Sequence, residues 1–365
     1  MSSDNSPGAP LAGSERLNQN WADVDAPSRA TVWRHIRAFR YQGPGRANSG
    51  RRKAVFSSAL EQAEQLFDAA DTIGYAARPI LLFYGLSQAG RAIAAASIVA
   101  DNNTYTLAGH GIKVPGLGQR PPLHELNVVD DVGSGSFIQL AELLRSGTLP
   151  EGAPLGQLWA TIPDLSGPHL DTGSAEYLPW LRYSRVGVSE GIVTGRVSGL
   201  PRRLATADSA ELAGFLASYP TLAGFTLVTS VSDTGVPPRP DDALGLFCRW
   251  RLPSNRNELA PFTWREDRMQ DYEIVEDRLT QPYRGDSERF VFPAFGGATR
   301  PLHPLMTWWA LLFALSMLAR YEPESWTRDT DRNTSGNAVP LEAVLDRALH
   351  TCPELVSHTI EAVTR

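Results

Sequence analysis

The sequence predicts an α+β protein with a mainly α-helical core, built from the N- and C-terminal parts, and a β-containing middle region. Three observations lead to this prediction. Residues 302–319 form the longest apolar run of the chain and contain only three polar side chains. Residues 79–100 form a second apolar run that is rich in alanine, and β-branched residues gather within 159–252.

Length and charge limit the classes of protein to consider. A chain of 365 residues forms one large domain or two ordinary ones, and it can bury a large core without metals or disulfides. Its 34 Lys and Arg residues against 40 Asp and Glu residues give a net charge of −6. This balance argues against a general nucleic-acid coat protein, which would be basic overall, but it is compatible with a local basic groove.

Cysteine usage indicates a reducing compartment. Cys248 and Cys352 are far apart and belong to no Cys-x-x-Cys pair, so the sequence predicts neither a metal site nor a redox motif. We interpret them as buried free thiols in a cytoplasmic protein. The N-terminus has no basic stretch followed by an apolar one, so we expect no secretory signal, and no pattern indicates a cofactor.

We expect four regions along the chain. Residues 1–20 are rich in Ser, Gly, Pro and Asn and are predicted to form a disordered tail. A helical N-terminal part follows over 21–150, and a β-containing part over 151–295. Residues 296–365 are predicted as a helical C-terminal part that packs on the N-terminal helices.

The N-terminal part begins with two amphipathic helices. Ser28 is a plausible cap for a helix that lies within 25–41 and carries apolar residues at helical spacing. A glycine- and proline-containing turn ends it, and a second amphipathic helix is predicted at 54–73.

The third helix is apolar over most of its surface. Pro79 begins it, and it runs to about Ala100. We expect it to pack directly on the helix that contains 302–319. Gly85 and Gly90 lie inside it, where glycine is unfavourable by about 1 kcal/mol relative to alanine, so we expect them to mark close helix crossings.

The chain between 102 and 295 changes to turns and strands, with short helices among them. The predicted elements are a loop region at 102–131, a short helix at 136–145, strands within 182–199, 222–232 and 243–252 of a β-rich stretch that begins at Trp159, a helix at 208–219, an irregular charged segment at 253–289 and a short edge strand at 290–295.

The apolar run near the C-terminus is predicted as the helix around which the core is arranged. Thr299 is its expected N-cap, Pro301 and Pro304 lie in its first turn, and Pro323 stops it. Apolar residues cover every face, so the helix is buried either in protein or in lipid. Because a membrane span needs about 20 residues, we interpret this shorter run as core and expect no membrane contact. The segments predicted after it are a polar loop at 327–339 and a terminal helix at 341–349 that 355–363 continue.

Three stretches carry a family resemblance. They are residues 78–86 (RPILLFYGL), residues 109–112 (GHGI) and residues 312–323 (LFALSMLARYEP), the last followed by Trp326. They resemble the RPLLLYYxLxxL helix, the HGL turn and the LFxLSxxxRYxPxxW block of the YaaC-like proteins. The resemblance spans roughly Trp33 to the C-terminus, is weakest over 159–289, and implies a bacterial intracellular protein. It carries over no catalytic residues, and whether the chain is an enzyme stays open.

The residues that match this pattern suggest a ligand site. We expect Arg78, Tyr84, His110, Arg320 and Tyr321 to converge in a cleft beside the helix at 301–320 and to bind an anionic small molecule or nucleic acid. His110 could also act as a general base. The simpler alternatives are that Arg320 only complements the negative end of its helix, and that His110 only follows a turn set by its two flanking glycines.

Two other hypotheses remain open. Arg29 and His35 have the Arg-x4–6-His spacing of HEPN-type ribonucleases, which act without metal, so the chain is alternatively a toxin or defence effector that cleaves RNA. The third hypothesis is a structural or assembly subunit without a ligand, such as a homo-oligomer. Gly296 and Gly297 precede the main helix, but the Gly-Lys-Ser/Thr ending of a phosphate loop is missing.

Overall fold

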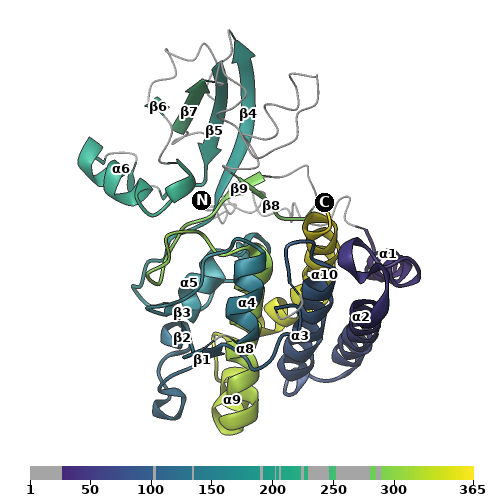
Figure 1. The fold of residues 1–365 in the computed structure, drawn as a ribbon. Helices are drawn as coiled ribbons and strands as arrows, with labels where there is room; N and C mark the ends of the chain where they lie inside the picture. The colour runs from purple at the N-terminus through teal and green to yellow at the C-terminus, as the bar shows by residue number, and fades with distance from the viewer. Residues whose placement is uncertain are drawn as a thin grey trace, which may run out of the picture.

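A computed structural model describes residues 27–101, 104–133, 135–189, 192–201, 203–204, 207–222, 226–228, 246–251, 280–284 and 289–365. The predicted tail at 1–20 and most of the charged segment at 253–289 lie outside these residues. The described chain forms a helical layer with a sheet at one end of it (Figure 1). A mainly helical α+β fold was predicted, and the structure confirms it.

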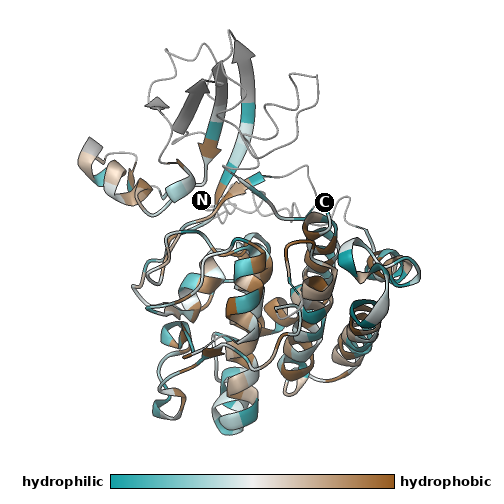
Figure 2. Ribbon diagram, in the orientation of Figure 1, coloured by the Kyte–Doolittle hydropathy of each residue, from teal (hydrophilic) through white to brown (hydrophobic). Residues whose placement is uncertain are grey.

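Three helices form the N-terminal part, as predicted. They are α1 (Arg29–Tyr41), α2 (Gly50–Thr72) and α3 (Arg78–Ala96). The Ser28 hydroxyl accepts a hydrogen bond from the Thr31 amide at 3.3 Å and caps α1. Pro79 lies in the first turn of α3, where its missing N–H costs nothing. Figure 2 shows that the outer helices α1 and α2 carry more hydrophilic residues than α8 and α10.

The C-terminal part contains α8 (Pro304–Tyr321), α9 (Pro323–Asp329) and α10 (Ala338–Val363). Pro323 ends α8 as predicted, but the polar loop expected from residue 327 begins inside α9. The terminal helix is a single helix, and it continues through Pro353. All residues of α8 from Pro304 to Ser316 are buried. None of the described helices has the length and hydropathy that a membrane span requires.

The predicted start of α8 is wrong. Thr299 does not cap it, and Pro301 lies before it. His303 is the N-cap, and its Nδ1 accepts a hydrogen bond from the Leu305 amide at 3.2 Å. The preceding residues are extended because they pair with a distant turn: the Gly147 amide donates to the Pro301 carbonyl at 2.9 Å, and the His303 amide donates to the Ser146 hydroxyl at 2.8 Å.

The close packing of α3 against α8 depends on Gly90. A Cβ atom at this position would lie 2.5 Å from a ring carbon of Trp309 in α8. A Cβ atom at Gly85 would lie 2.8 Å from the ring of Phe67 in α2. The two glycines therefore mark the crossings of α3 with α8 and with α2, and the expected contact between α3 and α8 is present.

Smaller elements cover the side of α8 away from α1 and α2 (Figure 1). They are α4 (Ser136–Leu143), α5 (Leu155–Ala160), and a sheet of β1 (Ile112–Lys113), β2 (Asn127–Asp130) and β3 (Ala153–Pro154) in the order β1-β2-β3. Two expectations are corrected here. The loop region at 102–131 contains both β1 and β2 and all of their pairing, and Trp159 lies in helix α5 rather than at the start of the strands.

The larger sheet is antiparallel, with the strand order β6-β7-β5-β4-β9-β8. Its strands are β4 (Leu181–Ser189), β5 (Ile192–Ser198), β6 (Thr226–Val228), β7 (Leu246–Arg251), β8 (Gln281–Pro282) and β9 (Arg289–Val291). The edge strand predicted at 290–295 is instead β9, which lies between β4 and β8. Asp208 caps α6 (Ser209–Leu216) beside the sheet. Short 3₁₀ helices occur at Gly45–Asn48, Leu117–Gln119, Leu123–Glu125, Pro163–Leu165 and Pro220–Leu222.

Candidate functional site

Three of the five predicted ligand residues, Tyr84, Arg320 and Tyr321, meet at the C-terminal end of α8, and a fourth, His110, packs on Phe313 about two turns earlier on the same helix. The Arg320 guanidinium donates to the hydroxyl of Tyr84 on α3 and to the hydroxyl of Tyr321, each at 3.0 Å. Its central carbon lies 5.7 Å and 4.9 Å from the centroids of the same two rings. The positive charge of Arg320 contributes to a lowered pKa of His110, but among the described residues no hydrogen bond joins the two side chains. We name Tyr84, His110, Arg320 and Tyr321 the donor cluster.

The loop that carries His110 is fixed against the start of α4. The Phe137 amide donates to the His110 carbonyl at 3.0 Å, and the Asp131 amide donates to the Gly111 carbonyl at 3.0 Å. Gly111 has a φ of 77°, and a Cβ atom at Gly135 would lie 2.2 Å from its Cα. The glycine after His110 is therefore required for this close approach, as the simpler reading of the turn expected.

The position of the His110 imidazole nevertheless allows it to contact a ligand as well as to follow the turn. Its ring lies against Phe83 and Phe313, with centroid distances of 5.6 Å and 5.5 Å. Burial on this side, followed by the positive charge of Arg320, lowers the pKa of His110 below its usual 6.5. The opposite side of the residue is exposed to solvent. His110 is therefore mainly neutral near pH 7 and reachable by a ligand.

Among the described residues, the donor cluster contains hydrogen-bond donors that have no carboxylate or carbonyl partner. Within the part of the chain that the structure describes, Arg320 makes no ion pair. Over the same residues, the Tyr84 and Tyr321 hydroxyls accept from Arg320 but donate to no acceptor, and neither ring nitrogen of His110 makes a hydrogen bond. Within the described residues, Arg320 donates to none of the last carbonyls of α8. The Leu318 carbonyl accepts instead from the Glu322 amide. Guanidinium, phenol and imidazole groups in this arrangement can bind a phosphate or carboxylate.

The nearest acidic neighbours along the chain are turned toward another arginine. Arg120 Nε lies 3.3 Å from a carboxylate oxygen of Glu322, and its NH2 group lies 3.2 Å from Glu324. Arg120 holds a left-handed backbone conformation with a φ of 53°. These two ion pairs keep the carboxylate that follows Tyr321 away from Arg320, which preserves the positive character of the cluster.

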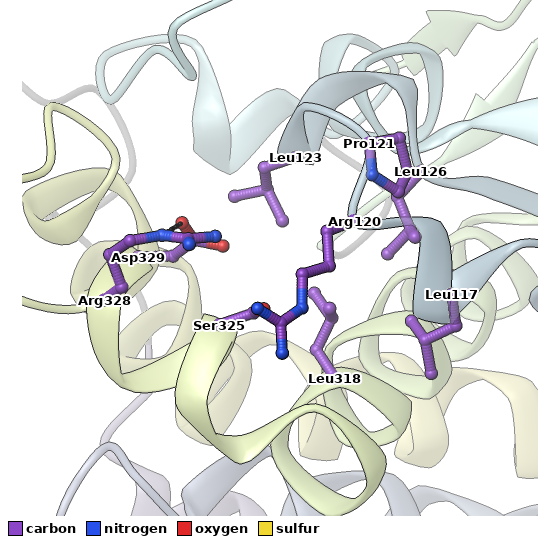
Figure 3. Close-up of a pocket in the computed structure, with 9 residues that line it drawn as sticks. All are labelled: Leu117, Arg120, Pro121, Leu123, Leu126, Leu318, Ser325, Arg328 and Asp329. Atoms are coloured by element: carbon purple, nitrogen blue, oxygen red, sulfur yellow. Dashed lines mark ion pairs between the residues drawn. The ribbon is translucent and has the colours of Figure 1, made fainter.

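The small pocket beneath Arg120 is too small for a ligand. It lies between the 117–126 loop and α9, with Leu318 of α8 in its wall (Figure 3). Its volume is about 20 Å³, which is room for about one water molecule. The buried Ser325 hydroxyl in its wall has no hydrogen-bond partner among the described residues. A bound water would satisfy this hydroxyl, so we regard the pocket as structural.

Arg78 lies apart from the donor cluster. It is six residues before Tyr84 on α3, and its side chain is 10% exposed. It forms an ion pair with Asp346 of α10, donates to the Ile73 carbonyl at 3.1 Å and stacks on Tyr75. These contacts tie α3 to α10 and to the end of α2, so the structure gives Arg78 a structural role.

The ribonuclease candidates Arg29 and His35 contact different helices. Arg29 pairs with Asp68 and Asp71 of α2, at 3.3 Å and 3.0 Å. His35 Nε2 lies 2.9 Å from Glu361 of α10. A separation of six residues places two side chains about a third of a turn apart on a helix. The structure therefore does not bring this pair to one point.

Sequence reasoning missed a buried ionic network near the start of α8. Arg284 makes two hydrogen bonds to Glu354 of α10, at 2.7 Å and 3.0 Å, and one to Asp164 at 3.0 Å. Asp164 also accepts from Tyr283 at 2.7 Å and from Thr351 at 2.9 Å. The Trp308 indole of α8 donates to the Tyr283 hydroxyl at 2.9 Å and completes the chain of contacts.

This network is largely buried and its charged groups are paired, although Arg284 and Glu354 also border a surface pocket of about 570 Å³. The side chains of Asp164 and Glu354 are 2% and 7% exposed, and that of Arg284 is 13% exposed. Burial and the charge of Asp164 raise the pKa of both Tyr283 and Cys352, so the phenol and the free thiol stay protonated. The buried thiol that was predicted at Cys352 is confirmed, while the side chain of Cys248 lies outside the described residues. No group of three or more His, Cys, Asp or Glu residues suited to a metal occurs in the described ranges.

Comparison with known proteins places the chain in a family. The model of the family described as YaaC-like Protein matches residues 25–360, which is nearly the whole chain. The chain belongs to the YaaC-like protein family. The resemblance seen in residues 78–86, 109–112 and 312–326 is thereby confirmed. No curated protein and no solved structure matches the chain. For this YaaC-like protein, the site must therefore be interpreted from its own geometry.

Proposed function

We propose that this YaaC-like protein binds an anionic ligand at the donor cluster, either a small molecule with a phosphate or carboxylate group or the phosphates of a nucleic acid. The observation that carries the proposal is that Arg320 is held by two phenols and has no carboxylate partner in the described chain. Arg284, near the other end of α8, differs from Arg320 because two carboxylates pair with it. The proposal leaves out Arg78, whose charge Asp346 already balances.

The chemistry of the cluster favours an anion over other ligands. A phosphate or carboxylate oxygen can accept from the guanidinium and from the free O–H of Tyr84 or Tyr321 at the same time. His110 would add a further donor and would gain a proton more easily beside a bound anion. We assign no reaction to the site. We also propose a cytoplasmic location, which the buried, unpaired thiol of Cys352 supports.

The test is a titration with two probes, inorganic phosphate and a short single-stranded RNA, followed by calorimetry. We expect Arg320→Gln to weaken the binding at least about tenfold. Arg29→Gln is the matched control, because it removes the same charge from an arginine that Asp68 and Asp71 already pair. Equal binding by the wild-type protein and Arg320→Gln, or no binding of either probe, would overturn the proposal.

The salt dependence separates the two kinds of ligand. Binding of RNA through several phosphates would fall steeply with salt, because each neutralised phosphate releases a counterion. Binding of a single small anion would fall much less. The ribonuclease hypothesis gains no support from the described residues, because Arg29 pairs with α2 and His35 with α10. The exposed large apolar side chains, such as Tyr41, Val132 and Val339, are spread over separate elements.

A further inference from the structure

A concave site lies beside α5, next to the residues that precede β4 and follow β5. It is a pocket of about 430 Å³, bordered by α5, the segment 162–180 and the β4–β5 end of the sheet. Its apolar walls are Trp159, Ile162, Leu165, Leu170, Tyr177 and Trp180. Small-molecule pockets in proteins have volumes of about 300 to 1,000 Å³ and occur where structural units meet. This pocket has the size and position of a ligand site, and the donor cluster is not part of it.

The walls are held in place before any ligand arrives. The Trp159 indole donates to the Pro168 carbonyl at 2.9 Å. The Gln157 amide group clamps residue 178, since it donates to the Leu178 carbonyl at 2.9 Å and accepts from the Leu178 amide at 3.0 Å. These bonds tie Pro168 and Leu178 to α5, which lowers the conformational entropy that binding would cost at these two points.

The aromatic walls are fixed in the same way. The Tyr177 hydroxyl donates to the His124 carbonyl at 3.2 Å. The Tyr177 ring lies over Gly156, where a Cβ atom would approach it to 2.2 Å, so this glycine is what admits the ring. Trp180 contacts Phe290 edge-on, with a centroid distance of 5.3 Å. Two indoles and a phenol thus line one open pocket, and each ring is held by a contact with the protein.

The lining selects against charged ligands. Its described residues include no Asp, Glu, Lys or Arg. The polar groups are the Ser166 and Thr172 hydroxyls and the His169 imidazole, which can hydrogen-bond to one edge of a ligand. Aromatic rings prefer offset-stacked or edge-to-face partners. We propose that this pocket binds an uncharged heteroaromatic molecule, with its ring against Trp159 and Trp180 and a polar edge toward His169.

The test uses indole and adenosine as uncharged probes, titrated into the full chain and followed by calorimetry. We expect at least one probe to bind, and Ala160→Phe to weaken it at least about tenfold, because Ala160 lines the pocket and a larger side chain would fill it. Trp180→Ala should weaken binding as well. Tyr41→Ala, which removes an exposed ring far along the chain, should leave the affinity unchanged.

The outcomes are distinguishable from those at the donor cluster. Arg320→Gln should leave indole or adenosine binding unchanged, so failure of the anion site does not affect this result. Ala160→Phe keeps the test valid if Trp180→Ala does not fold. The proposal is overturned if neither probe binds at millimolar concentration, or if Ala160→Phe binds as tightly as the wild-type protein.

Discussion

The polar side chains near the start of α8 are paired with one another, whereas those at its C-terminal end include an arginine without a carboxylate partner in the described chain. Near its start, Trp308 contacts Tyr283, which donates to Asp164, and Asp164 pairs with Arg284 in a closed network. At its end, Arg320 is partly exposed, and within the described ranges its hydrogen bonds go only to two phenols. Buried charges are costly unless each has its partner, so the first arrangement ties elements together. The second keeps donors available, and this difference is the basis for placing the ligand site at the C-terminal end.

The largest expected effect of a substitution is at the buried end. Asp164→Ala would leave Arg284 with one carboxylate partner, and the Tyr283 and Thr351 hydroxyls without their acceptor. Breaking a buried ion pair costs about 3–5 kcal/mol in the free energy of unfolding. Urea denaturation measures this change directly. A loss below about 1 kcal/mol would show that the network does not stabilise this end of the helix.

The next effect depends on pH and concerns the helix cap. Burial lowers the pKa of His303 from 6.5 to about 4. The unfolded chain therefore binds more protons between these values, and stability that is complete above pH 6.5 is lost as the pH falls toward 4. The loss is at most about 3 kcal/mol, because part of the residue remains accessible to solvent.

The control for this prediction is His303→Asn. Asparagine can accept the hydrogen bond from the Leu305 amide but does not titrate. Denaturation curves at pH 7 and pH 4.5 should therefore differ less for the variant than for the wild-type protein. An unchanged pH dependence would assign the acid sensitivity to other groups.

A smaller loss of stability is expected where α3 packs against the middle of α8. Gly90→Ala places a Cβ atom 2.5 Å from the Trp309 ring, and overpacking of this kind costs about 1–3 kcal/mol. Gly214→Ala is the matched control, because Gly214 also lies inside a helix, α6, and no atom lies within 4 Å of its Cβ position. Thermal melting of the two variants compares them. A melting temperature equal to that of Gly214→Ala would mean that the contact with Trp309 accommodates the added methyl group without cost.

The smallest effect on stability is expected at the exposed end. Arg320→Gln should change the free energy of unfolding by less than about 1 kcal/mol, because partly exposed arginines contribute little. A loss as large as that of Asp164→Ala would mean that Arg320 is structural after all. The same urea experiment therefore ranks both ends of the helix on one scale.

The helices that build the core could be predicted because their signals are local. The apolar run at 302–319 and the glycines of α3 indicated the contact between α3 and α8, and the structure places Gly90 at that contact. The N-cap was misassigned because His303 depends on the distant Ser146–Gly147 turn. A local sequence pattern does not show that residues distant in the chain will hydrogen-bond to this segment and delay the start of the helix.

The candidate site was predictable only in part, for the same reason. Tyr84, His110, Arg320 and Tyr321 were singled out by the family pattern. The structure joins Tyr84, Arg320 and Tyr321 by hydrogen bonds and packs His110 on Phe313 of the same helix. Arg78 matched the same pattern, but it forms an ion pair with Asp346, which lies far along the chain. The network of residues 164, 284 and 354 left no local signal, because each of its members is isolated in sequence.

The most direct test of the account is an NMR titration of the His110 imidazole with and without inorganic phosphate. We predict a pKa below 6.5 in the free protein, because burial and Arg320 disfavour the charged ring. Phosphate at the donor cluster should raise this pKa in the wild-type protein but not in Arg320→Gln. A His110 pKa that phosphate does not change, or changes equally in both proteins, would contradict an anion site at the end of α8.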